Sequence, residues 1–276
     1  MWGRYIAVGD SFTEGLDDRY AAGGYCGWAD RLAQLLHDQN ADLAYANLAI
    51  RGRKTDRIVR EQIPEAIAQG PDLVTFAAGV NDLMGPRWDP ATTFEHMSRG
   101  LAQLRAAGAD VLVVAFGDPV DLRGPTARWR DRFEVLNRGT VALAREHGCL
   151  LLDFWPMTGV SDERHWSEDR LHLSNLGHRA TAMAAAEVLG VGDASWRQDV
   201  TDRPAVPSRL QRVRSDVHWT FAHAVPWALR RVRNQSSGDE VSAKRPVLTR
   251  LSAQPLPETP PRGDESPNGY AAEPST

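Results

Sequence analysis

Short apolar runs alternate with longer amphipathic stretches over the first two-thirds of this chain, and this alternation constrains the fold more than any other feature. The runs with the character of strands are Arg4–Val8, Leu43–Leu48, Asp72–Ala77, Val111–Phe116 and Cys149–Phe154. The stretches with helical periodicity are Gly27–Gln39, Thr55–Gln69, Thr92–Ala107, Thr126–His147 and Ser174–Leu189. Almost wholly apolar strands are expected where helices cover both faces of a parallel sheet. The sequence therefore predicts a flavodoxin-like, three-layer α/β/α fold with a five-stranded parallel sheet.

The chain has 276 residues, enough for this domain and an appendage. We expect the α/β domain to occupy residues 1–192 and a basic helical extension to occupy residues 193–233. Residues 234–276 are rich in Pro, Ser and Gly and have no sustained apolar period. Such a composition buries too little surface to offset the entropy of ordering, so we expect this tail to be disordered.

The basic extension allows two interpretations. Arg209–Arg233 carries six arginines against a single acidic residue, Asp216, and its near-helical spacing is interrupted by Pro226. The favoured interpretation is a helix packed on the α/β domain with its arginines in solvent. The alternative is an amphipathic helix lying on an anionic membrane surface.

Charge and cysteine content exclude several classes of protein. The net charge of −4 gives no general attraction to nucleic acid, so we expect no such partner. Cys26 and Cys149 are the two cysteines, which implies no disulfide framework and suits a reducing compartment. Met1–Val8 is a strand pattern rather than a signal peptide, and no apolar run approaches the roughly 18 residues that span a bilayer. These features predict a cytoplasmic enzyme and carry no prediction of its oligomeric state.

Functional residues are sought at the carboxyl ends of the strands, where sites form in open α/β sheets. Ser11 directly follows the first predicted strand, in Gly9-Asp10-Ser11-Phe12. A serine there is either a nucleophile presented at the sheet edge or the N-cap of the following helix.

Asp169 and His172 are spaced so that one turn of chain brings the carboxylate to the imidazole, which orients the ring for proton transfer. The alternatives are a pair of loop or capping residues, or half of a metal site with His165 and His178; we expect no metal. His178 is a rival base, but it falls inside the predicted helix that begins at Ser174. We therefore expect it to pack or hydrogen-bond locally, and its replacement to leave activity nearly unchanged.

Hydrogen-bond donors for an oxyanion follow the second and third predicted strands. Gly52 has an unobstructed N–H, and Asn81 offers a side-chain amide. Ordinary turn chemistry is the alternative for each of them.

Four segments together resemble the conserved blocks of the SGNH/GDSL hydrolases, in the order of that family: Gly9–Gly15, Asn47–Gly52, Gly79–Asp82 and Asp169–His172. The resemblance covers roughly residues 3–190. It implies hydrolysis of esters or thioesters through an acyl-serine, with Ser11, Asp169 and His172 as the catalytic triad and no cofactor. It also implies an oxyanion hole made by the N–H groups of Ser11 and Gly52 and the amide of Asn81. We name Asp10 and Asp82, their neighbours in these blocks, as supporting residues. Ala49 and Leu173 depart from common family residues, and we expect them to affect loop shape only.

The expected substrate is a small-molecule ester, with a short acyl or acetyl group, because nothing predicts a long apolar tunnel. A lysophospholipase or thioesterase acting on lipid acyl groups is the alternative enzyme. Tryptophans in the predicted top loops either line the substrate pocket or anchor the core: Trp88, Trp129, Trp155 and Trp166. A different class of function is a catalytically silent flavodoxin-like binding module. A phosphate- or nucleotide-binding protein is a third hypothesis, but it assigns no role to Asn81 or His172.

Overall fold

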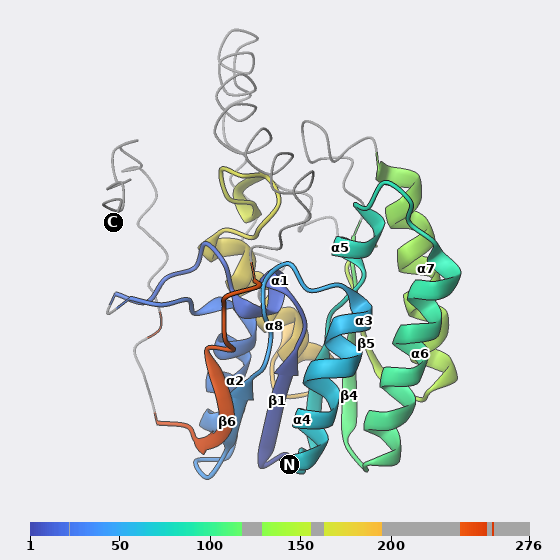
Figure 1. The fold of residues 1–276 in the computed structure, drawn as a ribbon. Coiled ribbons are helices and arrows are strands. Elements are labelled where there is room, and N and C mark those ends of the chain that lie inside the picture. Colours follow the sequence, from blue (N-terminus) through green and yellow to red (C-terminus); the bar gives the residue numbers. More distant parts are fainter. Residues whose placement is uncertain (22, 118–128, 156–162, 195–237, 253–255, 257–276) are drawn as a thin grey trace, which may run out of the picture.

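The computed structural model describes residues 1–21, 23–117, 129–155, 163–194, 238–252 and 256 (Figure 1). Its centre is a six-stranded sheet with the strand order β5-β4-β3-β1-β2-β6. The strands are β1 (Arg4–Val8), β2 (Ala44–Asn47), β3 (Leu73–Phe76), β4 (Asp110–Ala115), β5 (Leu150–Asp153) and β6 (Arg245–Arg250). The first five strands are parallel to one another, and β6 is antiparallel to β2.

Helices cover both faces of the sheet. They are α1 (Ser11–Glu14), α2 (Gly27–Gln39), α3 (Thr55–Arg57), α4 (Ile63–Ala68), α5 (Val80–Leu83), α6 (Pro90–Ala106), α7 (Arg130–Glu146) and α8 (Asn175–Val188). A π-helical turn, Ile58–Gln62, joins α3 to α4, and a 3₁₀ turn, Glu163–His165, precedes α8. None of the helices that the structure describes combines the length and apolarity needed to cross a membrane.

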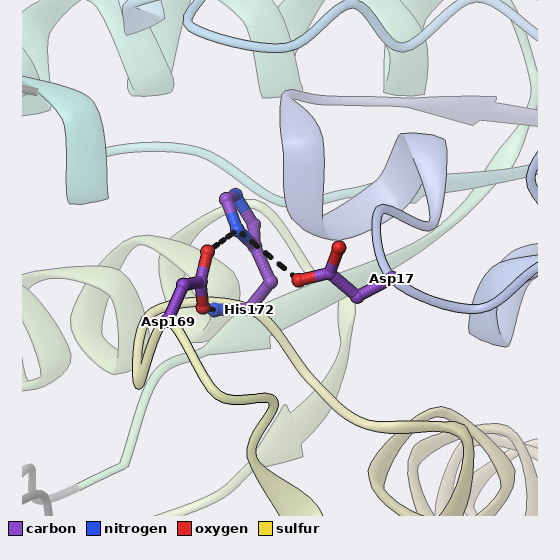
Figure 2. Close-up of side chains that lie close together, drawn as sticks. All are labelled: Asp17, Asp169 and His172. Carbon is purple, nitrogen blue, oxygen red and sulfur yellow. Dashed lines mark hydrogen bonds and ion pairs between the residues drawn. The ribbon is translucent and has the colours of Figure 1, made fainter. Parts of the chain in front are cut away.

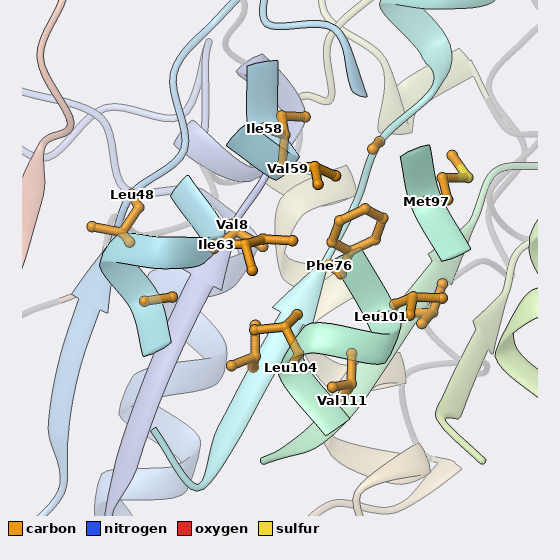
Figure 3. Close-up of a cluster of buried hydrophobic side chains, with 14 of the residues drawn as sticks. Val8, Leu48, Ile58, Val59, Ile63, Phe76, Met97, Leu101, Leu104 and Val111 are labelled. Atoms are coloured by element: carbon orange, nitrogen blue, oxygen red, sulfur yellow. The ribbon is translucent and has the colours of Figure 1, made fainter. Parts of the chain in front are cut away.

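Side chains of β1 alternate between the two halves of the core, as the pleat of a strand requires. Tyr5 and Ala7 pack with α2 and α8 on one face. Ile6 and Val8 pack on the other face with residues of α4, α6 and α7. Figure 3 shows this second cluster, with Phe76 of β3 among side chains from the helices. Burial on both faces explains why these strands are apolar at almost every position.

The predicted three-layer α/β/α fold and its five parallel strands are confirmed. β1 and α2 have the predicted bounds, and most other predicted elements agree within two residues. The predicted helix Thr55–Gln69 is instead two short α-helical pieces around the π turn. For the helix predicted to begin at Thr126, residues 126–128 lie outside the described part of the chain, and so does the predicted basic helix at 209–233.

The prediction of a five-stranded sheet followed by a wholly disordered tail is wrong in one respect. Within residues 234–276, Arg245–Arg250 forms the edge strand β6. Most of its side chains are exposed, so it carries little of the apolar signal that marks a buried strand. Backbone pairing with β2 makes this strand, and composition does not report such pairing.

Candidate active site

The turn after β1 presents Ser11 at the carboxyl edge of the sheet. The Asp10 side chain caps α1 by accepting a hydrogen bond from the Phe12 N–H, with 3.1 Å between Asp10 Oδ1 and the nitrogen. Ser11 is thus the first helical residue, and its hydroxyl is not engaged in capping. A Cβ on Gly9 would lie 2.8 Å from the carbonyl oxygen of Ala77, so this tight turn requires a glycine there. The N-cap interpretation of Ser11 is therefore wrong, and the cap is Asp10.

Asp169 and His172 form a hydrogen-bonded pair in the loop before α8 (Figure 2). Asp169 Oδ2 lies 2.5 Å from His172 Nδ1. Its other oxygen accepts bonds from the Ser167 hydroxyl at 2.7 Å and from the N–H groups of Leu171 and His172, each at 2.9 Å. Arg170 between them has a φ of 57°, which closes this tight loop. The carboxylate is therefore fixed by four donors, and its orientation fixes the ring.

The electrostatics of the pair suit a base that becomes charged. Burial opposes ionisation of Asp169, but the hydrogen bonds and charge of His172 outweigh burial and hold the pKa of this carboxyl well below its usual range. Burial also lowers the pKa of His172, yet Asp169 outweighs it, and the pKa of the imidazole rises above its usual 6.5. With Nδ1 bonded to Asp169, Nε2 is the nitrogen left to exchange a proton with a substrate or nucleophile.

His172 lies beside the loop that follows α1, the helix that begins at Ser11. Its Nδ1 is 3.9 Å from Asp17 Oδ2, just beyond α1. The charges of Asp17 and Asp10 both contribute to the raised pKa of His172. Two segments more than 150 residues apart in the sequence therefore meet at the carboxyl end of β1.

The predicted oxyanion donors lie at the ends of the strands on either side of β1. Gly52, beyond β2, has a φ of 72°, a left-handed conformation that favours glycine. Asn81 lies in α5 beyond β3, and its Nδ2 donates to Asp10 Oδ2 at 2.8 Å and to the Arg53 carbonyl at 3.2 Å. The Ser11 N–H, in the first turn of α1, has no intrahelical acceptor. Asn81 thus ties the Ser11 turn to the Gly52 turn.

Of the two supporting aspartates at these turns, Asp10 is buried and Asp82 is half-buried. Burial raises the pKa of Asp10 to about 6, although the Phe12 N–H, His172 and Asn81 oppose the rise. Burial also raises the pKa of Asp82, which accepts bonds from the N–H and hydroxyl of Thr55, at 3.0 and 2.9 Å. Asp82 therefore holds the start of α3, three residues beyond Gly52.

His178 has a different environment from the paired histidine. It is 1% exposed, its Nδ1 accepts from the Trp28 N–H at 3.1 Å, and its Nε2 donates to the Leu16 carbonyl at 2.9 Å. Burial lowers its pKa to about 4. His178 packs in the interior, as expected, but its ring bonds residues that are 150 and 162 positions away in the sequence and not local groups. With both nitrogens engaged it has no atom free to act as a base.

One group of ligand-type side chains comes together in the described part of the chain: Asp17, Asp169 and His172, whose ligand atoms lie within 4.8 Å of one another. A cation bound at His172 Nδ1 would compete with the bond to Asp169. The group is therefore explained as an oriented histidine with a neighbouring carboxylate. His165 and His178, the other metal candidates in the sequence, are not part of it.

Three interactions of the site were not predicted from the sequence. Gln62, at the end of the π turn, forms two hydrogen bonds with the backbone of Gly9. Its Oε1 accepts from the Gly9 N–H at 2.8 Å, and its Nε2 donates to the Gly9 carbonyl at 2.9 Å. Glu14 is buried and binds both the N–H and the guanidinium of Arg51. Asp17 approaches His172 as described. Glu14 stands in the first sequence block, but nothing local signals its partner.

Three of the four candidate tryptophans favour the core-anchor interpretation, whereas Trp166 is outside both core clusters and forms an isolated bridge with Leu173. Trp88, Trp129 and Trp155 are partly buried against the core on the α6–α7 face. The Trp88 ring nitrogen also bonds the hydroxyl of Thr93 at 3.0 Å, at the start of α6.

Comparison with known proteins identifies the family to which this chain is similar. A family model described as the GDSL-like Lipase/Acylhydrolase family matches residues 7–180. No curated protein sequence matches the chain. Among solved structures, the acetylxylan esterase Axe2 from Geobacillus stearothermophilus is similar, with 18% identity, a TM-score of 0.56 and coverage of 70% of this chain and 97% of the other.

Two further structures have a comparable likeness. LAE5, an alpha/beta hydrolase enzyme from the metagenome of Lake Arreo in Spain, is 18% identical with a TM-score of 0.58, covering 70% of this chain and 97% of that one. TesA is 23% identical with a TM-score of 0.57, covering 67% and 97%. At these identities the likeness concerns the fold.

Proposed function

Because the chain belongs to the GDSL-like lipase/acylhydrolase family, we propose that it is a serine esterase in which Ser11 is the nucleophile, His172 the general base and Asp169 its partner. Family membership supports hydrolysis of ester bonds. The observation that carries the assignment of residues is the Asp169–His172 pair, fixed through Nδ1 beside the turn that presents Ser11.

The reaction follows from the roles of these groups. As Ser11 Oγ attacks the ester carbonyl carbon, His172 Nε2 takes the hydroxyl proton and Asp169 stabilises the imidazolium. The carbonyl oxygen becomes an oxyanion, which accepts hydrogen bonds from the N–H groups of Ser11 and Gly52. It also accepts from Asn81 Nδ2, which exchanges its bond to Asp10 or to the Arg53 carbonyl for one to the oxyanion. Collapse of the tetrahedral intermediate breaks the ester C–O bond, and His172 returns the proton to the leaving alcohol.

Water completes the cycle. His172 takes a proton from a water molecule while the water oxygen attacks the acyl carbon, and a second oxyanion forms. Ser11 then leaves as the imidazolium returns the proton to its oxygen. The products are a carboxylic acid and an alcohol, with no cofactor consumed. The Asn81 amide, held by Asp10 in this structure, keeps its nitrogen between the turns that carry the other two donors.

Short acyl esters are the proposed substrates. The structurally similar Axe2 is an acetylxylan esterase, and its described catalytic mutants replace a serine, an aspartate and a histidine, the last two three residues apart in its sequence. Asp169 and His172 have the same spacing. An acetyl or similarly short acyl group on a small alcohol or sugar is consistent with this likeness.

The test is hydrolysis of nitrophenyl esters from acetyl to palmitoyl by the wild type and by Ser11→Ala. The wild type is expected to turn over the short esters fastest and to react with a fluorophosphonate probe. Ser11→Ala is expected to lose at least about 10⁴-fold in kcat and to remain unlabelled, with its folding unchanged.

Ser98→Ala is a matched control, because Ser98 Oγ lies 2.9 Å from His147 Nε2 and forms a second serine–histidine contact. This variant is expected to keep full activity. Wild-type rates in a clean preparation of Ser11→Ala would overturn the assignment of the nucleophile. Fastest turnover of palmitoyl esters would replace the short-acyl proposal with a lipid acylhydrolase.

A further inference from the structure

Residues 238–252, here called the returning segment, bring the C-terminal part of the chain back to the α/β domain. Its strand β6 pairs with the outer edge of β2, with Tyr45 opposite Thr249 and Asn47 opposite Arg245. β2 leads directly into the turn that carries Gly52. In Figure 1 the returning segment is the orange-red stretch that runs from the end of the sheet where α1 lies down along its edge. The edge of the sheet nearest the oxyanion turn is therefore covered by this segment.

Lys244, just before β6, inserts its ammonium beside the turn that carries Ser11. Nζ lies 2.6 Å from the carbonyl oxygen of Glu14, the last residue of α1, and 2.5 Å from that of Cys26. It also contacts the Tyr25 carbonyl at 3.1 Å and forms an ion pair with Asp30 in α2, whose side chain is 10% exposed. One cation thus holds both ends of the loop between α1 and α2.

The beginning of the returning segment lies on the other turn. Gly238 is buried so closely against Arg51 that a Cβ would lie 2.1 Å from the Arg51 carbonyl oxygen. Asp239 pairs with Arg57 at 3.0 Å and with Arg53 at 3.5 Å. Arg51 and Arg53 are the two neighbours of Gly52 in the sequence. The contacts at Gly238 and Asp239 therefore bear on the residues that flank the predicted oxyanion donor.

Glu14 links the two sets of contacts. Its carboxylate accepts from the Arg51 N–H at 2.7 Å, while its carbonyl accepts from Lys244. The Ser11 turn and the Gly52 turn are thus joined to each other and to one external segment. Catalysis of acyl transfer depends on the nucleophile and the oxyanion donors being held in one geometry, and a misplacement of about 1 Å can cost about 100-fold in rate.

We propose that the returning segment positions the active site, with Lys244 holding the Ser11 turn and Gly238–Asp239 holding the Gly52 turn. Lys244 and Asp239 are positioning residues, since they act through backbone and arginine contacts and not on the substrate. The proposal rests on the proposed esterase function for its kinetic consequence, but its structural consequence is independent of any activity.

The test compares three variants of the full chain. Lys244→Met keeps the length of the side chain and removes its donors, which leaves buried oxygens without a partner. Asp239→Asn is a milder change at a half-exposed residue. Arg250→Ala is the control, because Arg250 lies at the far end of β6 and pairs with the exposed Asp42.

Lys244→Met is expected to lower kcat for nitrophenyl acetate about 10- to 100-fold with little change in KM. Asp239→Asn is expected to lower it several-fold, and Arg250→Ala to leave it unchanged. In hydrogen exchange, Lys244→Met should speed exchange in residues 12–26 and 49–54, while the strands β3 and β4 keep wild-type protection.

Unchanged exchange in both turns, in Lys244→Met and in Asp239→Asn, would overturn the positioning role. So would faster exchange throughout the domain, because the segment would then support stability in general. If the wild type proves inactive on esters, the esterase proposal fails, while the exchange comparison still decides whether this segment orders the two turns.

Discussion

His172 and His178 are six positions apart in the sequence, and the regions around them treat the same side chain in opposite ways. His172 lies in the loop before α8, with 16% of its side chain exposed and a carboxylate on Nδ1. His178 lies in the first turns of α8 and is 1% exposed, and its two ring nitrogens bond a backbone N–H and a backbone carbonyl. The pKa of the first is raised, and burial lowers the pKa of the second to about 4.

The difference shows that the type of partner, more than burial, decides what a buried histidine can do. A carboxylate stabilises the imidazolium, so His172 can accept a proton and hold it during a reaction. A backbone N–H and a backbone carbonyl, one on each nitrogen, stabilise the neutral ring in a single tautomer. His178 therefore serves as a fixed link between α8, the Leu16 loop and the start of α2.

The largest expected effect is on the chemistry of the first histidine. His172→Ala removes the general base and is expected to lower kcat/KM for nitrophenyl acetate about 10⁴-fold, or about 5 kcal/mol of activation free energy. Stability should change little, because the ring is partly exposed and Asp169 keeps its bonds from Ser167 and Leu171. Steady-state kinetics and urea denaturation measure the two quantities on the same preparation.

Near wild-type turnover in His172→Ala would contradict the difference between the two histidines, since His172 would then be a structural residue like His178. Asn substitution at the same site is a useful control for packing. It restores a polar side chain without a base, so it should remain as inactive as the alanine variant.

Replacement of His178 is expected to lower the stability of the fold and to leave the catalytic rate nearly unchanged. His178→Ala leaves the Trp28 N–H and the Leu16 carbonyl buried without a partner and is expected to cost roughly 3 kcal/mol of unfolding free energy. The fraction that remains folded should keep most of its kcat, in line with the near-neutral effect on activity expected from the sequence.

His178→Gln, which can still donate to the Leu16 carbonyl, should recover part of that stability. Denaturation midpoints at pH 7 measure the series. The pKa of His178 in the folded chain is about 4, below its usual 6.5, so the neutral form stabilises the fold above pH 6.5 and this contribution is lost as the pH falls toward 4. A wild-type-like midpoint in both variants would mean that His178 is not a structural link.

Most of the fold was predictable because the burial of each element is reflected in its own local sequence pattern. The strands of the parallel sheet are buried on both faces, so each is an apolar run, and the predicted bounds of β1 agree with the structure. β6 was missed because an edge strand with a mostly exposed surface has no such run. The π turn was missed because its residues keep their apolar face toward the core, as the α-helix around them does.

The site divides in the same way. The sequence blocks contain Ser11, Gly52 and Asn81, and the structure places them at neighbouring strand ends; their catalytic roles stay predictions. The bonds from Gln62 to Gly9 and from Lys244 to Glu14 join residues distant in the sequence. A single sequence contains no local signal for such pairs, because nothing about either residue alone specifies the other.

Substitution of Asp17 is expected to have the smallest effect, because it changes the charge near His172 and leaves the Asp169–His172 hydrogen bond in place. Three carboxylates influence the pKa of His172, in the order Asp169, Asp17 and Asp10. Asp17 is more than one-third exposed on its side chain and lies 3.9 Å from Nδ1, so solvent screens its effect.

Since His172 must be neutral to accept the Ser11 proton, kcat/KM should rise with pH through its pKa, with the midpoint of the acid limb above 6.5. Asp17→Asn removes one negative neighbour, lowers the pKa of His172 and is expected to move this limb to lower pH, with the plateau rate unchanged. Asp42→Asn, an equal charge change at a distant exposed site, should leave the limb in place. An acid limb that stays fixed in Asp17→Asn would mean that the raised pKa comes from Asp169 and Asp10 without Asp17. A limb that moves equally in both variants would mean that the shift reflects the net charge of the protein and not the position of Asp17.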